Sequence, residues 1–161
     1  MSIAGPQAFY NTLNKIKEQL LADVNVNTVT TGDLTEVDLN KQTIFPLSHI
    51  IVNNAQLMGS TILFDFSVLA MDVVWQTKNV AAEGTIDTTF VGLDNEQDVL
   101  NTQLAVLNKL NEVIRRGEVF TDKFQLSGTP TCEPFYDNYE NKLAGWTYTA
   151  QIIVQNDIDV C

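Results

Sequence analysis

Hydrophobic side chains recur at helical spacing near the start of the chain. Phe9, Leu13, Ile16 and Leu20 follow one another at intervals of four, three and four residues, which places them on one stripe of a helix. The charged residues between them fall off this stripe. The pattern predicts an amphipathic helix from about Pro6 to Ala22 that buries one face and leaves the other in water.

A second helical pattern lies between residues 95 and 117, and its end signals agree with its periodicity. Asn95 is placed to cap the helix, acidic residues follow it, and two arginines precede Gly117, so both ends match the helix dipole. The acidic residues are Glu96 and Asp98, and the arginines are Arg115 and Arg116. The predicted buried stripe comprises Leu100, Leu104, Leu107, Leu110 and Ile114.

Alternating apolar and polar positions predict strands in much of the remaining chain. The predicted strands are Val24–Thr30, Ile44–Val52, Ile62–Ala70, Phe124–Cys132 and Trp146–Gln155. Gly32-Asp33 ends the first strand, and Asn53-Asn54 with Gly59 marks the turn after the second. Pro46 lacks a backbone donor, so it belongs at a sheet edge or at the start of a strand.

The third predicted strand is apolar on both faces. Its main face carries Ile62, Phe64, Phe66, Val68 and Ala70. Leu63, Leu69 and Met71 make the other face apolar too, which predicts a central strand partly covered on both sides. Because Val73 and Trp75 fall on the opposite parity to the main face, the pattern also predicts a bulge near Asp72.

The elements follow the order helix, three strands, helix, two strands. This order predicts an α+β fold, with two amphipathic helices packed on one face of a mostly antiparallel or mixed sheet of about five strands. Residues Gln76–Asp94 lack a clear period and are predicted to form an extended loop or a small protruding hairpin, and Tyr136–Gly145 reads as a polar turn. With no repeat or linker, residues 1–161 form a single predicted domain.

Composition narrows the range of partners. The chain is 45% hydrophobic and 18% charged, as in globular proteins, and its 9 basic and 20 acidic residues give a net charge of -11. Such a charge disfavours attraction to nucleic acid and to anionic membranes. Solubility is one explanation of the acidity, and a surface that repels DNA is the other.

The cysteines and the apolar runs indicate the compartment. Cys132 and Cys161 show no metal-ligand spacing and are interpreted as free thiols. No apolar run approaches the roughly 18 residues of a membrane span, and residues 1–6 do not resemble a secretory signal. We therefore expect a soluble protein made and kept in a cytoplasm.

Residues that could carry catalysis form no recognisable set. His49, the one histidine, lies in a predicted strand without a nucleophile motif and is expected to be a hydrogen-bonded structural residue. Asp65 and Asp72 lie on opposite faces of an unbroken strand, although a bulge between them could bring them together. Phosphate-binding and calcium-binding loops are missing as well. The sequence therefore predicts no cofactor, no metal and no enzymatic activity.

Two groups of residues are candidates for binding. Ile86, Phe90, Val91 and Leu93 are apolar residues within the polar segment 76–94, and exposed residues of this kind often form a subunit interface. The alternative is that they fold back on their own domain. The acidic residues of a predicted loop form the second group: Asp33, Glu36 and Asp38.

Four segments together resemble the tail-terminator and neck proteins of tailed bacteriophages. They are the first helix, FPLSHIIVNNAQLMGSTILFDFSVLAMDVV (45–74), DNEQDVLNTQLAVLNKLNEVI (94–114) and the closing TYTAQIIVQNDIDVC. The resemblance follows the order of most of the chain. Its shared features are patterns, such as a strand ending in Met71-Asp72 and an Asn-Glu start to a helix.

The resemblance implies a small α+β subunit of a virion ring, usually a hexamer, which caps the tail tube and joins it to the neck proteins. DNA would pass through this ring without specific binding, and carboxylates lining the channel would repel its phosphates. Asp33, Glu36 and Asp38 are candidates for that surface. Alternatives are another head–tail connector, a tail-completion or tube protein, and an α+β ligand-binding domain unrelated to phages.

Overall fold

The computed structural model describes residues 6–34, 42–74, 96–116, 124–136 and 143–155. The elements are α1 (Pro6–Leu21), β1 (Thr28–Thr31), the short 3-10 helix η2 (Gln42–Ile44), β2 (Leu47–Leu57), β3 (Thr61–Val73), α2 (Glu96–Arg116), β4 (Phe124–Tyr136) and β5 (Leu143–Gln155). Two helices and a five-stranded mixed sheet confirm the predicted α+β fold and the predicted order of its elements.

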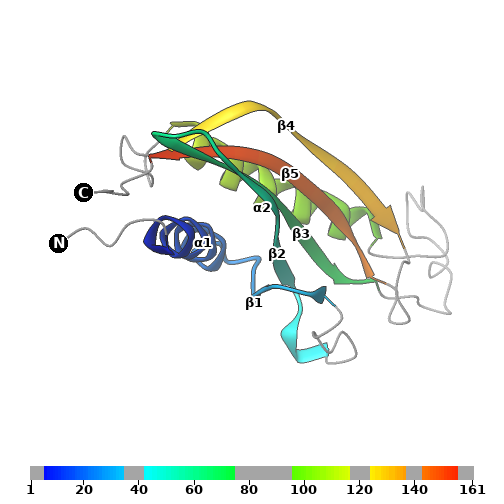
Figure 1. Ribbon diagram of the computed structural model, residues 1–161. Coiled ribbons are helices and arrows are strands. Elements are labelled where there is room, and N and C mark those ends of the chain that lie inside the picture. The colour runs from blue at the N-terminus through cyan, green and yellow to red at the C-terminus, as the bar shows by residue number, and fades with distance from the viewer. Residues whose placement is uncertain (1–5, 35–41, 75–95, 117–123, 137–142, 156–161) are drawn as a thin grey trace, which may run out of the picture.

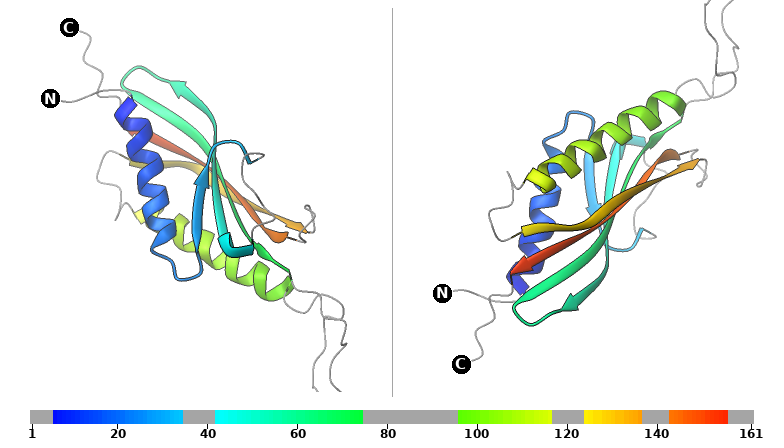
Figure 2. Two further views of the ribbon diagram at one scale, coloured as in Figure 1. Left: turned by 90° about the horizontal axis from the view of Figure 1, so that it is seen from below. Right: turned by 90° about the horizontal axis from the view of Figure 1, so that it is seen from above.

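The five strands form one sheet in the order β1-β2-β3-β5-β4, as Figure 1 shows. β1 runs parallel to β2, and the other neighbouring pairs are antiparallel. β3 therefore lies at the centre, and β1 and β4 form the two edges. The start of α1 and the end of β5 lie at the same end of the molecule (Figures 1 and 2).

Both helices pack against the same face of the sheet. One buried cluster joins Ile16 and Leu20 of α1 and Leu107 and Leu110 of α2 to side chains of the central strands, among them Phe66. This arrangement confirms the predicted stripe of α1, in which Phe9 and Leu13 are partly buried at the margin of the cluster. Burial of this joint apolar surface provides the main driving force for folding.

The buried stripe of α2 differs from the prediction at one position. Leu104 was predicted to be buried but is 37% exposed, whereas Gln103 is only 1% exposed. The buried stripe is broader than an i, i+3, i+4 pattern of leucines, since it also includes Val99, Gln103 and Val106. Leu104 instead borders an open groove beside β4.

β2 is longer than predicted, and Asn53-Asn54 does not form a turn. The strand continues through both asparagines to Leu57, with a register irregularity between Val52 and Asn54. Pairing with β3 outweighs the local turn preference of asparagine here. The predicted turn at Gly59 is correct, since this residue has a positive φ of 78° and the N–H of Met58 bonds to the carbonyl of Thr61.

The predicted bulge near Asp72 is wrong. Asp72 pairs with Ala144 and Val73 with Leu143, in register with the rest of the β3–β5 ladder. A second cluster covers the other sheet face at this end, and it comprises Phe45, Leu47, Leu69, Met71, Val73, Phe135 and Leu143. Val73 is therefore apolar because it lies on the second buried face of one regular strand, and not because the strand changes register.

Some strand boundaries also shift. β1 begins at Thr28, because the chain turns between Asp23 and Val26 and leaves Val24 96% exposed. β4 extends beyond Cys132 to Tyr136, and β5 begins at Leu143, within the predicted turn. The predicted loop or hairpin at 76–94 lies outside the described residues.

Candidate functional site

The face of the sheet that points away from the helices is polar across its middle, next to the apolar cluster that covers one end. Strand alternation places on it hydroxyl, amide and carboxylate side chains, which we call the polar sheet face: Asp65, Ser67, Ser127, Thr131, Glu133, Thr147, Thr149 and Gln151. Ser67, Thr149 and Thr131 form one row across three strands. The hydroxyls of Ser67 and Thr149 lie 3.2 Å apart, and Asn53 donates to Ser67.

The charges of the described residues are divided between the two layers. None of the five strands contains a lysine or an arginine, and the polar sheet face contains two carboxylates, Asp65 and Glu133. The described basic residues lie on the helices, and they are Lys15, Lys17, Lys109, Arg115 and Arg116. Among the described residues, the polar sheet face therefore offers no lysine or arginine to bind a phosphate.

The structure describes only part of the predicted binding residues. Asp33 is exposed just after β1, and Glu36 and Asp38 lie outside the described residues. The predicted interface residues are also outside them: Ile86, Phe90, Val91 and Leu93. The position of one group relative to the other therefore lies outside the described residues.

His49 is a structural residue, as the sequence predicted. Its ring is fully buried in β2, where Nδ1 lies 2.7 Å from the hydroxyl of Thr30 and Nε2 lies 2.9 Å from the carbonyl oxygen of Gly32. Because a carbonyl can only accept, Nε2 carries a proton and donates. Burial lowers the pKa of His49, although the Gly32 bond and the charge of Asp33 oppose this effect.

Asp65 and Asp72 do not form a carboxylate pair. With no bulge between them in the β3–β5 ladder, they lie on opposite faces of β3. Asp65 lies 3.3 Å from the amide of Asn53, and Asp72 accepts a 2.8 Å bond from the N–H of Val73. Burial raises the pKa of Asp72, and the Val73 bond partly opposes that shift.

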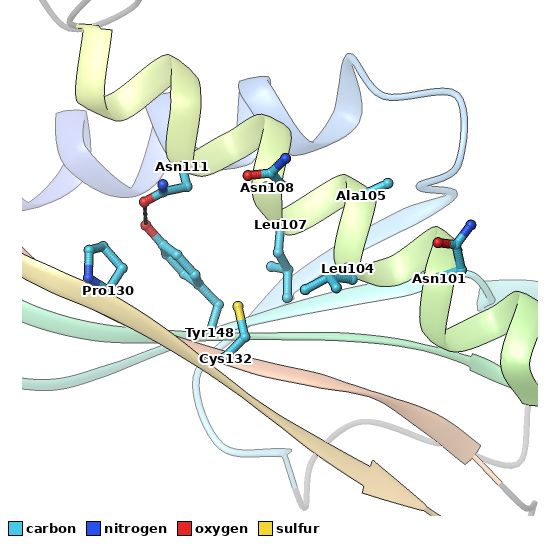
Figure 3. A pocket seen from close by; sticks show the side chains of 9 residues that line it. All are labelled: Asn101, Leu104, Ala105, Leu107, Asn108, Asn111, Pro130, Cys132 and Tyr148. Atoms are coloured by element: carbon cyan, nitrogen blue, oxygen red, sulfur yellow. Dashed lines mark hydrogen bonds between the residues drawn. The ribbon is translucent and has the colours of Figure 1, made fainter.

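A groove of about 470 Å³ runs between α2 and the strands β4 and β5. Figure 3 shows its walls, where α2 contributes Asn101, Leu104, Leu107, Asn108 and Asn111. Pro130, Cys132 and Tyr148 face them from the strands. The β4–β5 register breaks between Ser127 and Thr131, with a positive φ of 69° at Gly128, so β4 bulges beside the helix.

The groove is suited to binding and contains no activated nucleophile. Cys132 is a free cysteine, and burial raises the pKa of its thiol, so the thiolate is disfavoured. Burial likewise raises the pKa of the Tyr148 hydroxyl, which donates to Oδ1 of Asn111. The amides of Asn101 and Asn108 offer both donors and acceptors, and Asn111 offers its Nδ2 donor, because its Oδ1 accepts from Tyr148.

One end of the groove is basic. A second hollow shares Asn111 and Pro130 with the first and extends the groove to Arg115 and Arg116. Both arginines pair with a single carboxylate, Glu112, at 2.8 and 3.3 Å. This cluster therefore keeps one net positive charge in a chain whose net charge is -11.

No protein-family model matches this chain, and no curated protein matches it either. Within the described ranges, no group of three or more histidine, cysteine, aspartate or glutamate side chains is arranged to hold a metal ion. Neither α1 nor α2, the helices of the described part, has the length and hydropathy to span a bilayer.

Sequence reasoning missed the α2 groove. Asn101, Asn108 and Asn111 are spaced seven and three residues apart, which places them along one side of α2, and this spacing was the available signal. The depth of the groove depends on the bulge in β4, however, and Gly128 and Pro130 alone do not reveal its position. From the sequence, Tyr148 was only one residue of the predicted strand Trp146–Gln155.

Proposed function

We propose that this protein is a virion structural subunit that forms a ring, caps the tail tube as a tail terminator, and joins the tail to the neck. Genome DNA passes through the ring without specific binding. The resemblance of the four sequence segments supports this proposal, and so does the α+β fold. Copies of the chain, tube proteins and neck proteins are the partners, and the virion is the location.

The observation that carries the proposal is the absence of basic residues from all five described strands. A DNA conduit must not hold phosphates, because each cation that contacts a phosphate adds affinity through counterion release. Hydroxyls, amides and the carboxylates Asp65 and Glu133 satisfy this requirement. We therefore assign the polar sheet face to the lumen and the helices to the outer layer.

The first test is the state of assembly. Negative-stain microscopy of the purified chain, and of particles assembled in the host, should show a ring with a central hole wide enough for duplex DNA. A chain that stays monomeric at high concentration and is absent from purified particles would refute the proposal.

The second test is charge reversal on the assigned lumen. Asp65→Lys with Glu133→Lys should leave the ring intact but make it retain DNA in a mobility assay, more strongly at low salt. Glu18→Lys with Asp98→Lys is the matched control, since it adds the same charge to the exposed faces of the helices. Equal DNA retention by both variants would argue against a lumen lined by the sheet.

The α2 groove favours a second candidate, a binding domain for a small molecule or a peptide. Its volume of about 470 Å³ lies within the roughly 300–1,000 Å³ typical of ligand sites. Native mass spectrometry of the purified chain would distinguish this candidate, because a bound metabolite on a monomer favours it over the ring.

A further inference from the structure

The α2 groove has the features of a docking site for an extended peptide. β4 is an edge strand, and the bulge at residues 128–130 leaves a wall of side chains facing α2. Leu104, which is 37% exposed, supplies apolar contact, whereas the asparagine amides can pair with peptide N–H and C=O groups. A peptide backbone needs such partners wherever it leaves water.

The charge of the groove selects an acidic occupant. Arg115 and Arg116 are about 60% exposed, and together they have only Glu112 as a paired carboxylate within the described part of the chain. Lys109 lies on the same half of α2 and is also exposed. An incoming carboxylate would find several unused guanidinium donors at this end.

The chain itself contains a segment with the required chemistry. In Asn156-Asp157-Ile158-Asp159-Val160, carboxylates alternate with β-branched apolar residues. This segment follows β5 and lies outside the described residues. β5 ends close to the basic end of the groove, because Ile152 and Ile153 pair with Leu126 and Gln125, which line that end.

We infer that the acidic segment 157–160 of one copy docks in the α2 groove of a neighbouring copy. Its apolar side chains would contact Leu104 and Pro130, and its carboxylates would contact Arg115 and Arg116. To dock in the groove of its own copy, the chain would have to reverse direction through a four-residue turn after β5. Asp157 comes only two residues after Gln155, the last residue of β5, so it would lie within that turn. A second copy is therefore the better acceptor. The inference rests on the proposed ring, since it requires copies side by side.

The test compares two pairs of variants of the full chain by sedimentation velocity. Arg115→Ser with Arg116→Ser removes the basic end, and Asp157→Asn with Asp159→Asn removes the acidic partner. Lys15→Ser with Lys17→Ser and Glu18→Gln with Asp98→Asn change the net charge equally at helix positions that do not line the groove. We expect both test variants to lose assembly and both controls to assemble like the wild type.

A mixture separates docking between copies from docking within one copy. When the two test variants are mixed in equal amounts, the arginine variant supplies an intact acidic segment and the aspartate variant supplies an intact groove. A dimer of one copy of each can therefore make one docking contact. We expect dimers in the mixture and monomers in either variant alone. A mixture that stays monomeric would overturn docking between copies.

A peptide titration tests the groove independently of assembly. The probe is acetylated Gln-Asn-Asp-Ile-Asp-Val, added to the full-length Asp157→Asn, Asp159→Asn variant while side-chain amide signals of the groove asparagines are followed by NMR. Binding should shift these signals and should weaken about fivefold when Arg115 and Arg116 are also replaced by serine. No shift would overturn the inference.

The outcomes distinguish this inference from the proposed function. Rings that form normally in both test variants would overturn the docking alone and leave the ring standing. A wild-type chain that never assembles, in solution or on particles, would instead count against the proposed function.

Discussion

The hydroxyl of Tyr148 donates a 2.9 Å hydrogen bond to Oδ1 of Asn111, and this bond joins β5 to α2 across the floor of the groove. Tyr148 is only 1% exposed, and burial raises its pKa, so the phenol remains a neutral donor. The bond also orients the Asn111 amide. Because Oδ1 accepts from Tyr148, the Nδ2 group is the part of the amide that remains to donate to other groups. Stability and groove geometry thus depend on the same contact.

Tyr148→Phe should lower the free energy of unfolding by about 1 kcal/mol, since it removes one hydrogen bond and keeps the ring. Urea denaturation measures the change. Tyr136→Phe, at an exposed position of β4, is the matched control and should have little effect. If Tyr148→Phe destabilises an Asn111→Ala background just as much, the bond is not the source of the loss.

Gln103→Met should raise the free energy of unfolding by about 1 kcal/mol. Gln103 is buried in α2, and its Nε2 and Oε1 have no hydrogen-bond partner within the part of the chain that the structure describes. Methionine has a similar length and helix propensity but no amide to desolvate. Gln97→Met, at an exposed position of the same helix, controls for the substitution itself. A loss of stability in Gln103→Met alone would mean that the amide is satisfied in solution.

The parts of the fold that depend on local pattern could be predicted from the sequence, and those that depend on remote partners could not. Helix periodicity and end charges placed α1 and α2 within a residue or two. Asn53-Asn54 misled because pairing with β3 decides its conformation. Near Asp72, the apolar parity depends on Phe45 and Phe135, which are distant in the sequence.

The candidate site was less predictable than the fold. The acidity and the structural role of His49 followed from composition and from the lack of partner motifs. The division of charge between layers, in contrast, required the assignment of every strand to one sheet. The α2 groove required the position of the β4 bulge, which depends on cross-strand pairing.

Gly145→Ala should lower the free energy of unfolding by roughly 2–3 kcal/mol. A Cβ on residue 145 would overlap the backbone carbonyl oxygen of Ala70 and would lie 2.9 Å from the Cα of Met71, so two paired strands would have to separate. Gly59→Ala is the comparison, because it meets open space but forces alanine into a positive φ of 78°, at a cost of about 1 kcal/mol. Equal losses in thermal or urea unfolding would contradict close packing of β3 on β5.

Acidification through the range in which histidine titrates should reduce stability because of His49. Burial lowers the folded-state pKa of His49 below its ordinary 6.5, so the unfolded chain binds a proton that the folded chain does not. The free energy of unfolding should therefore fall as the pH drops below about 6.5, with a slope of at most about 1.4 kcal/mol per pH unit. His49 is the only histidine of the chain, so no other imidazole titrates in this range. The raised pKa of Asp72 has the opposite effect on stability, because proton binding by Asp72 favours the folded state as the pH approaches 3.8. His49→Gln should be less stable at pH 7 but should lose the slope between pH 7 and 5.5, as measured by urea denaturation across this range. A variant that keeps the wild-type slope would show that another group is responsible.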